Sequence, residues 1–447
     1  MVVDQYAGAP RTGEHERLRH KIATREAEIC VVGLGYVGLP LAVALAEAGF
    51  RVRGLDVAAD KVQELREGRS YILDVPSDSV AAQTEAGRFR AETDAAYAVR
   101  GADVMIITVP TPYTSSKQPD LRYVMHASET IRMHLQPGAL VVLESTTYPG
   151  TTEEIVQPRL EETGLVCGQD FLLAYSPERI EPGNRRFGLK NTPKIVGGVT
   201  PEATELAGMV YGSIIEQIVP VENPRVAEMA KLLENTFRHV NIALANEMAI
   251  LCREMDINIW QVIDAAATKP FGFMPFYPGP GVGGHCIPID PYYFAWKVQE
   301  FQGYARFIEL AGQVNDQMPE IVARRVQDAL NDHGKSLKGA RVLVLGAAYK
   351  KDIDDVRESP ALHVIERLHK KGAEVSYHDD YVASLRTAAG ELRSVPFSPE
   401  VLRAADAVVI VTDHTNIPYG EVLRHAALVI DTRNAMRGYR DPKIVRL

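Results

Sequence analysis

The sequence has little of what would direct it to a metal ion, a nucleic acid or an oxidising compartment. Of its 447 residues only four are cysteines, Cys30, Cys167, Cys252 and Cys286, and they lack both the CxxC spacing of a zinc site and the density of a disulfide scaffold. No dense run of lysine and arginine is present, and the net charge of −9 argues against a nucleic-acid partner. We therefore expect no metal site, no nucleic-acid partner and a reducing, cytoplasmic location.

We also expect no signal peptide and no membrane span. Residues 1–28 are rich in charge and contain no apolar h-region. Residues 29–46 carry no charge, which meets the minimum length of a span, but three glycines and a proline interrupt them. A strand, a glycine turn and a buried helix explain this stretch better.

The segment EICVVGLGYVGLPLAVALAEAGFRVRGLDV predicts a βαβ unit. An apolar strand over residues 29–32 leads through a glycine turn to a helix ending at Gly49, and a second strand ends at Asp56. Apolar runs at 104–109 and 140–144 each precede a turn-rich stretch, as expected where parallel strands deliver loops to one edge of a sheet.

Residues 341–447 repeat this scheme. GAEVSYHDD matches GFRVRGLDV in position and pattern, and ADAVVIVTDH echoes ADVMIITVPT. The C-terminal copy lacks the later glycines of the first turn, so we expect it to bind a different ligand or none. The predicted fold class is α/β, with two Rossmann-like, doubly wound domains.

A long helix is predicted between the two copies. Residues 225–268 contain no glycine or proline, and apolar residues recur at helical spacing. A helix of about 40 residues would span roughly 60 Å, which favours a spacer and dimerisation surface; two shorter helices are the alternative. The predicted domains are an N-terminal extension (1–27, an extra helix or a tail), a dinucleotide-binding domain (28–210), a central helical dimerisation domain (211–330) and a C-terminal Rossmann-like domain (331–447).

The first glycine turn has the features of a dinucleotide site. Gly33, Gly35 and Gly38 form a GxGxxG motif that follows a strand and opens a helix, whose N-terminal N–H groups can bind phosphate. Asp56 ends the next strand, where a carboxylate accepts hydrogen bonds from a ribose and repels a 2′-phosphate. The pattern favours NAD; two arginines of the second strand leave NADP open, and a glycine turn without ligand is the alternative.

Cys286 lies in the bend GPGVGGHCIPIDP. The two glycines before it would let backbone and substrate approach the sulfur closely. Asp290 is predicted to cap the following helix, with Pro291 in its first turn. A thiol near a helix start is biased toward the nucleophilic thiolate; the alternative is a small buried cysteine in a tight loop.

Lys231 and Asn235 are four residues apart on the predicted helix and share one face. A cation beside an amide, close to a thiol, can stabilise an oxyanion or move a proton. The alternative is a solvated helix face.

Seven segments in order resemble the UDP-glucose/GDP-mannose dehydrogenase family, from about residue 28 over nearly the whole chain. They are VVGLGYVGLP, VPTP, ESTTYPGTTEE, YSPERIEPG, AKLLENTFRHVNIALANE, GPGVGGHCIPIDPYY and GAAYKKDIDDVRESPA. The resemblance implies an NAD-dependent oxidation of a sugar C6 alcohol to a carboxylate in two hydride transfers. It also implies a central dimer helix and a C-terminal domain that helps to hold the nucleotide of a nucleotide sugar.

The resemblance also implies roles for particular residues. Cys286 corresponds to the nucleophile that forms a thiohemiacetal and then a thioester, while Lys231 and Asn235 steady the C6 oxygen. Glu178 corresponds to the carboxylate that guides water to the thioester, and Thr146 and Asp290 assist in water and proton transfer. The implied substrate contacts are Lys350 and Arg433, and the implied cofactor residues are Gly33, Gly35, Gly38, Asp56, Pro110, Thr111 and Arg357.

The sequence departs from the glucose-type members at two places. Ile289 stands where they carry a lysine, and Pro182 stands where they carry a second glutamate, with Glu181 one place early. The HCIPxDP form is more similar to the branch that acts on UDP-N-acetylhexosamines, with UDP-glucose or dTDP-glucose as the alternative substrate. Two other functions are open: a two-electron β-hydroxyacid dehydrogenase, and a non-catalytic sensor of NAD and a sugar nucleotide.

Overall fold

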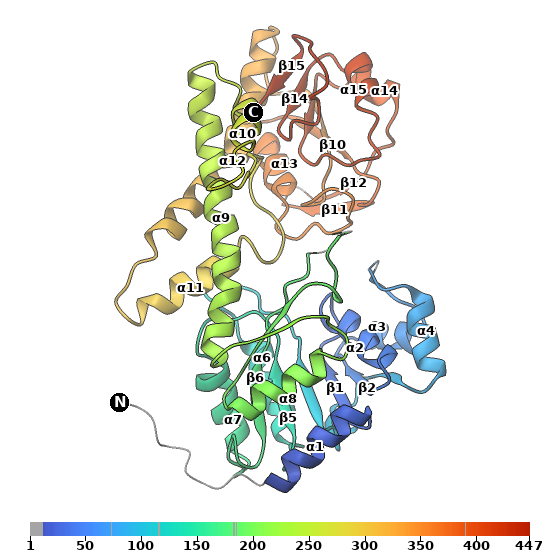
Figure 1. Cartoon of the computed structure of the whole chain (residues 1–447). Coiled ribbons are helices and arrows are strands. Elements are labelled where there is room, and N and C mark those ends of the chain that lie inside the picture. The colour runs from blue at the N-terminus through green and yellow to red at the C-terminus, as the bar shows by residue number, and fades with distance from the viewer. Residues whose placement is uncertain (1–11, 73, 115–116, 182–183, 185, 389) are drawn as a thin grey trace. The chain divides into compact units, whose positions relative to one another are not determined.

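A computed structural model describes residues 12–72, 74–114, 117–181, 184, 186–388 and 390–447. The chain forms two compact units, residues 1–234 and 235–447. Figure 1 shows that each unit contains its own sheet flanked by helices. The predicted α/β class with two Rossmann-like units is confirmed.

The first unit is built on an eight-stranded sheet in the order β3-β2-β1-β4-β5-β6-β7-β8. Its first six strands have the order of a dinucleotide-binding sheet and are parallel; β7 then runs antiparallel to β6. The strands are β1 (Glu28–Val32), β2 (Arg51–Leu55), β3 (Phe89–Glu92), β4 (Val104–Ile107), β5 (Leu140–Leu143), β6 (Leu172–Tyr175), β7 (Lys194–Gly198) and β8 (Ile218–Pro220).

Helices cover both faces of this sheet, because alternate residues of its strands enter two separate cores. In β1, Ile29 and Val31 belong to one core and Cys30 and Val32 to the other. The connecting helices are α2 (Gly38–Glu47), α3 (Ala59–Arg66), α4 (Ser77–Glu85), α5 (Ala95–Val99), α6 (Arg122–Arg132), η1 (Thr152–Val156), α7 (Gln157–Glu161) and α8 (Pro201–Tyr211).

The extension predicted over residues 1–27 contains a helix, α1 (Thr12–Thr24). Leu18 and Ile22 of α1 are buried in the core, and His15 bonds to Glu202 of α8 at 2.9 Å. Residues 12–24 are therefore a packed part of the first unit, and the prediction for residues 1–11 lies outside the described residues.

The second unit contains a five-stranded parallel sheet in the order β10-β9-β13-β14-β15. These strands are β9 (Arg341–Leu345), β10 (Glu374–His378), β13 (Ala407–Ile410), β14 (Val429–Asp431) and β15 (Ile444–Arg446), and β11 (Ser384–Thr387) pairs with β12 (Gly390–Arg393) as a separate ladder. Its helices are α10 (Ile259–Ala266), α11 (Asp290–Gln299), α12 (Arg306–Asp332), α13 (Pro360–Lys370), α14 (Pro399–Ala404) and α15 (Tyr419–His425).

The long central helix is present, but it is shorter than 40 residues. Helix α9 spans Pro224–Glu254, and α10 follows as a separate helix. The break occurs at Asp256, whose φ of 55° is left-handed, and Asn258 then caps α10 by accepting the N–H groups of Trp260 and Gln261. Apolar periodicity continues through the break because α10 buries its own apolar face, so the pattern could not reveal it.

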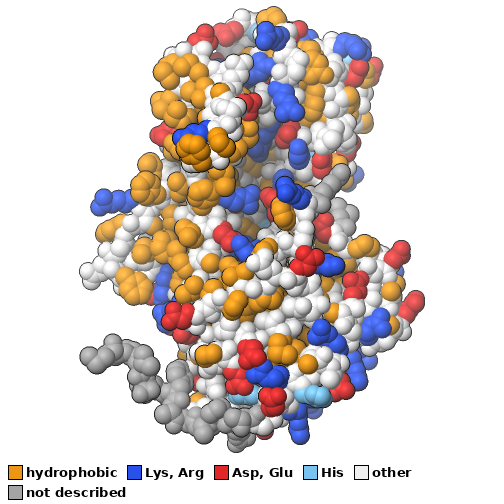
Figure 2. Space-filling model, viewed as in Figure 1, with side chains coloured by type: hydrophobic (Ala, Val, Ile, Leu, Met, Phe, Trp, Pro, Cys, Tyr) orange, Lys and Arg blue, Asp and Glu red, His pale blue; other side chains and the backbone are white. Residues whose placement is uncertain are grey.

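Hydrophobic side chains are exposed along the helices around this break. Figure 2 shows orange side chains gathered over the region of α9 to α12. The exposed residues of the second unit in this region include Phe237, Leu244, Met248, Leu251, Met255, Phe271, Phe273, Met274, Phe301, Tyr304, Phe307 and Leu310. A search of the described residues finds no helix with the length and apolarity needed to cross a membrane.

Candidate active site

The predicted dinucleotide turn lies between β1 and α2, at the point where the strand order reverses. A Cβ atom on Gly38 would lie 1.8 Å from the carbonyl oxygen of Gly33 and 2.5 Å from Oγ1 of Thr108, so only glycine fits there. A Cβ atom on Gly35, by contrast, would meet nothing within 4 Å. The turn is thus closely packed toward the protein and open where a pyrophosphate would bind.

Asp56 lies directly after β2, as the sequence predicted. Its carboxylate accepts the N–H groups of Leu34 in the glycine turn and of Ala58, both at 2.9 Å. Its half-buried position beside the turn fits a ribose. Pro110, which is exposed, and Thr111, which is half-buried, follow β4 on the other side of the switch point. These residues fit NAD, which supplies a hydride acceptor when bound.

Three charged side chains meet at the carboxyl edge of the same sheet. Glu144 follows β5, Glu178 follows β6, and Lys194 opens β7. Because β7 is antiparallel to β6, its first residue returns to the edge at which β5 and β6 end. Lys194 Nζ forms an ion pair with Glu144 and lies 3.5 Å from Oε2 of Glu178.

Burial controls the ionisation of this cluster. The pKa of Glu144 is raised to about 7, because burial outweighs the opposing effect of Lys194. Burial also raises the pKa of Glu178, but Lys194, the N–H of Ile180, a hydrogen bond with Glu144 and the charge of Lys231 together bring it below the ordinary value. The predicted residues Glu178 and Lys231 therefore interact electrostatically within the first unit, and Lys231 is buried rather than on a solvated face.

Thr146 is half-buried in the loop after β5. The adjoining turn is held by a residue that the sequence did not indicate, Glu228 of α9. Its buried carboxylate accepts the N–H groups of Gly150 (2.6 Å) and Thr152 (2.9 Å) and the hydroxyl of Thr152 (2.7 Å). Burial nevertheless raises the pKa of Glu228 to about 7.

In the second unit, Cys286 is half-buried in the loop that leads into α11. Its carbonyl oxygen accepts the N–H groups of Ile289 and Asp290 at 3.0 and 2.8 Å. The prediction that Asp290 caps the helix is wrong by one position: Ile289 is the cap and Asp290 is the first helical residue. The buried Asp290 carboxylate instead accepts the Nδ2–H of Asn235 at 2.5 Å, so these two predicted residues lie together.

The glycines of the cysteine loop have close protein neighbours. A Cβ atom on Gly283 would lie 2.7 Å from Tyr349 Cβ and 2.8 Å from the carbonyl oxygen of Glu358. The N–H of Gly284 bonds to the carbonyl oxygen of Arg357 at 3.0 Å. Packing against the segment after β9 is therefore sufficient reason for glycine at these positions.

The predicted substrate contact Arg433 lies against the same loop. A Cβ atom on Gly279 would be 2.6 Å from Nη1 of Arg433, whose Nε–H donates to the carbonyl oxygen of Val411 at 2.9 Å. The loop is also tied to α9, because Asn246 accepts the N–H of Gly279 at 2.8 Å and donates to Asn315 at 2.9 Å. Asn246 is a further residue that helical periodicity did not single out.

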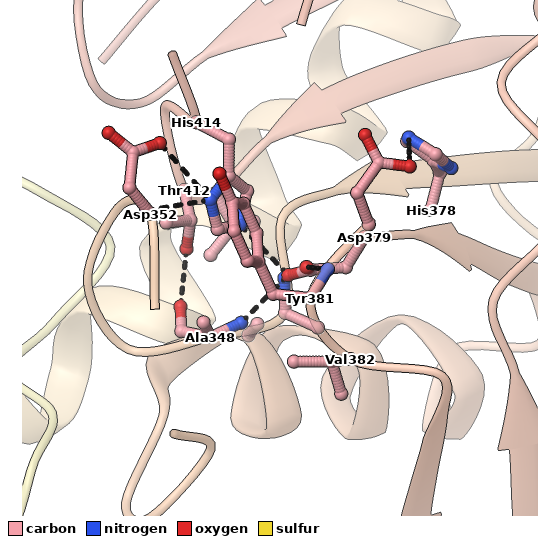
Figure 3. A network of polar contacts seen from close by, with 12 residues as sticks. Ala348, Asp352, His378, Asp379, Tyr381, Val382, Thr412 and His414 are labelled. Carbon is pink, nitrogen blue, oxygen red and sulfur yellow. Dashed lines mark hydrogen bonds and ion pairs between the residues drawn. The ribbon is translucent and has the colours of Figure 1, made fainter. Parts of the chain in front are cut away.

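The switch point of the second sheet is occupied by protein side chains (Figure 3). Asp379, after β10, accepts the N–H groups of Ala347 (2.7 Å) and Ala348 (3.0 Å), and it pairs with His414 Nε2 at 2.9 Å. The Nδ1 atom of His414 accepts the N–H of Asp352 at 2.9 Å. A carboxylate thus takes the N–H groups that would bind phosphate in a dinucleotide turn, which fits the expectation of a different ligand.

Lys350 and Arg357 lie in the segment after β9, which forms hydrogen bonds with Asp379 and His414. Lys350 is half-buried, and the exposed Arg357 binds Asp355 through three contacts of 2.6 to 3.0 Å. The described residues contain no group of three or more histidine, cysteine, aspartate or glutamate side chains suited to a metal ion.

A six-strand dinucleotide sheet with a complete GxGxxG turn and a terminal Asp56 is typical of an NAD-dependent dehydrogenase. The comparisons with known proteins agree. Residues 27–215, 225–317 and 343–438 match the NAD binding, central and UDP binding domains of the UDP-glucose/GDP-mannose dehydrogenase family. The chain belongs to this family and is a nucleotide-sugar dehydrogenase.

Several relatives match over most of their length. The chain is 37% identical to UDP-N-acetyl-D-mannosamine dehydrogenase of Pyrococcus horikoshii, covering 92% of this chain and 96% of the relative. It is 38% identical to UDP-N-acetyl-D-glucosamine 6-dehydrogenase of Salmonella typhi, covering 87% and 90%. The solved Pyrococcus horikoshii UDP-D-ManNAc dehydrogenase aligns with a TM-score of 0.85 at 34% identity, covering 94% and 98%.

Proposed function

We propose that the protein oxidises the C6 hydroxyl of a UDP-N-acetylhexosamine to the carboxylate with NAD. The observation that carries the substrate class is the identity of 37% and 38% to two dehydrogenases named for such sugars, over about nine-tenths of each chain. Among the solved structures, a UDP-glucose dehydrogenase is 28% identical and a UDP-D-ManNAc dehydrogenase is 34% identical, which also favours the N-acetylhexosamine.

The proposed chemistry uses Cys286 as the nucleophile. Its thiolate adds to the aldehyde formed by the first oxidation and gives a thiohemiacetal, and loss of a second hydride gives a thioester. Covalent capture keeps the reactive aldehyde on the enzyme. The half-buried position of the sulfur in the loop that leads into α11 supports this role.

The other predicted residues take roles that suit their chemistry. Lys231 and Asn235 stabilise the C6 oxygen, and Asp290, bonded to Asn235, holds that amide and passes a proton. Glu178, kept ionised by its surroundings, removes a proton from the water that attacks the thioester, with Thr146 assisting. The thiolate is then released and the carboxylate forms.

Binding roles follow the domains. We propose that residues 28–210 bind NAD through the glycine turn, Asp56, Pro110 and Thr111, with Arg357 also at the cofactor. Residues 331–447 hold the nucleotide through Lys350 and Arg433. Residues 211–330 form a homodimer surface, supported by the exposed hydrophobic residues of α9 to α12 (Figure 2).

The test is incubation of the purified protein with NAD and, separately, UDP-N-acetylglucosamine, UDP-N-acetylmannosamine, UDP-glucose and dTDP-glucose. We expect two NADH per sugar consumed with one of the N-acetylhexosamines. Turnover of UDP-glucose or dTDP-glucose alone would overturn the substrate class. One NADH per molecule would contradict the four-electron oxidation, and no NADH from any sugar would favour the sensor.

A further inference from the structure

The ion pair behind Glu178 is not used by the chemistry described so far. Lys194 is 3% exposed, and Glu144 is 1% exposed. Removing two charged groups from water is costly, so a buried pair of this kind stabilises a fold poorly compared with apolar side chains of similar size. Its position at the carboxyl edge of the sheet, in contact with the proposed base, suggests a role in the reaction.

The two oxygens of Glu178 have different partners. Oε1 accepts the N–H groups of Arg179 at 2.7 Å and Ile180 at 2.5 Å. Oε2 has Lys194 Nζ at 3.5 Å, a longer contact that leaves an oxygen lone pair for a water molecule. The carboxylate is therefore oriented by the backbone on one side and faces a positive charge on the other.

Glu144 shares the positive charge with Glu178. It pairs more closely with Lys194, and its second oxygen accepts the hydroxyl of Tyr211 at 2.6 Å. Lys194 also lies 4.9 Å from the centre of the Tyr211 ring. The charged groups that act on Glu178 are thus Lys194, Glu144 and, from α9, Lys231.

We infer that Lys194, held by its pair with Glu144, is a positioning residue that keeps Glu178 ionised and oriented as the base for thioester hydrolysis. The inference rests on the proposed role of Glu178. Lys194 contributes the positive charge that favours the carboxylate of Glu178, and Glu144 acts in the same direction through a hydrogen bond that lowers the pKa of Glu178. In the hydrolysis, water loses a proton to Glu178, its oxygen bonds to the thioester carbon, and the carbon–sulfur bond breaks to release the thiolate.

The decisive experiment compares Lys194→Met, Lys194→Arg and the double variant Lys194→Met/Glu144→Gln by the pH dependence of kcat. Without the lysine, Glu178 stays buried but loses the positive charge that favours its ionised form, so the acidic limb of the profile should move up by about one to three pH units. Lys194→Arg retains the charge and should leave the limb close to that of the wild type. The double variant also lacks the charge of Lys194, so its limb should stay above that of the wild type.

A rapid-quench measurement identifies the affected step. At pH values below its shifted limb, Lys194→Met should accumulate an acyl adduct on Cys286, detected by intact mass spectrometry, because hydrolysis is slowed. An unchanged limb in a folded Lys194→Met protein, or a double variant with the limb of the wild type, would overturn the inference. If Lys194→Met does not fold, the wild type, Lys194→Arg and the double variant are compared instead. The double variant should then accumulate the acyl adduct on Cys286. Its failure to do so would overturn the inference.

The proposed function is tested separately in the same samples. If the wild type forms neither two NADH per sugar nor a Cys286 adduct under any condition, the function itself is wrong. If the wild type forms both but the Lys194 variants keep its pH profile, only the role of Lys194 is wrong.

Discussion

At the scale of single residues, burial distinguishes chemically similar side chains. Among the four cysteines, Cys30, Cys167 and Cys252 are buried, while Cys286 is half-buried. Burial raises the pKa of Cys30 and of Cys167 to about 12, which keeps both as thiols. The amino-acid composition alone could not show which of the four cysteines is accessible, because the burial of a side chain depends on the tertiary structure.

Replacing Cys286 with alanine should reduce sugar-dependent NADH formation by about a thousandfold or more, because the covalent route is lost. The matched control is Cys252→Ala, a buried free thiol in the same unit, which should keep most of the turnover. Steady-state NADH formation with the best sugar of the panel measures both. Turnover of Cys286→Ala close to that of the control would rule out the proposed nucleophile.

Glu228 makes stability depend on pH. Its pKa is raised from 4.5 to about 7 by burial, so the folded protein binds a proton that the unfolded chain releases between these values. This contribution to stability is present below about pH 4.5 and is lost as the pH rises through about 7.

Glu228→Gln should therefore flatten the pH dependence of the free energy of unfolding over this range, by an amount on the order of 2 kcal/mol. Chemical denaturation at a series of pH values measures the slope. Glu144, whose pKa is also raised to about 7, still contributes part of the pH dependence of the free energy of unfolding in Glu228→Gln. A variant with the full wild-type slope would show that Glu228 is ionised throughout.

At the scale of elements, the two Rossmann-like sheets share a local pattern but place it in different hydrogen-bond networks. Each has an aspartate after its second strand, Asp56 in the first unit and Asp379 in the second. Asp56 accepts one N–H of its turn, whereas Asp379 accepts two and also pairs with His414. The repeated pattern was evident in the sequence, but the pairing with His414 depends on a third strand, β13, being the neighbour of β9.

Asp379→Ala should destabilise the second unit by about 2–3 kcal/mol, because two buried N–H groups and His414 lose their acceptor. The adjacent Asp380→Ala is the control, since the Asp380 side chain, which contacts Asn416 and His378, is exposed. Thermal unfolding of both variants measures the difference. Equal losses in the two variants would contradict the importance of this network.

At the scale of the whole molecule, the apolar stripe of α9 is the feature that a single chain does not explain. Leu244, Met248 and Leu251 recur at helical spacing in α9, Met255 directly follows the helix, and all four are more than one-third exposed. An apolar stripe that is buried in a protein core needs no further explanation. Because this stripe is exposed, it fits self-association of the protein.

Leu244→Lys combined with Leu251→Lys should weaken the proposed dimer by at least about tenfold in Kd, since both charges would be placed in an apolar contact. Val57→Lys, at an exposed apolar residue of the first unit, is the control and should leave association unchanged. Sedimentation velocity over a range of protein concentrations gives the comparison. A wild type that remains monomeric, or a double variant that associates as the wild type does, would exclude this surface.

The order of elements, the glycine turn with Asp56 and the family followed from the sequence by itself, because apolar periodicity and glycine spacing act over a few neighbouring residues. The tertiary structure alone decided which distant side chains meet: Glu144 with Lys194, Glu228 with the turn at Gly150, and Arg433 with Gly279. These contacts depend on the antiparallel return of β7 and on the packing of loops against helices, and neither leaves a local pattern in the chain. The break at Asp256 matches the alternative of two shorter helices, and the sequence could not decide for it because the next helix continues to bury apolar residues.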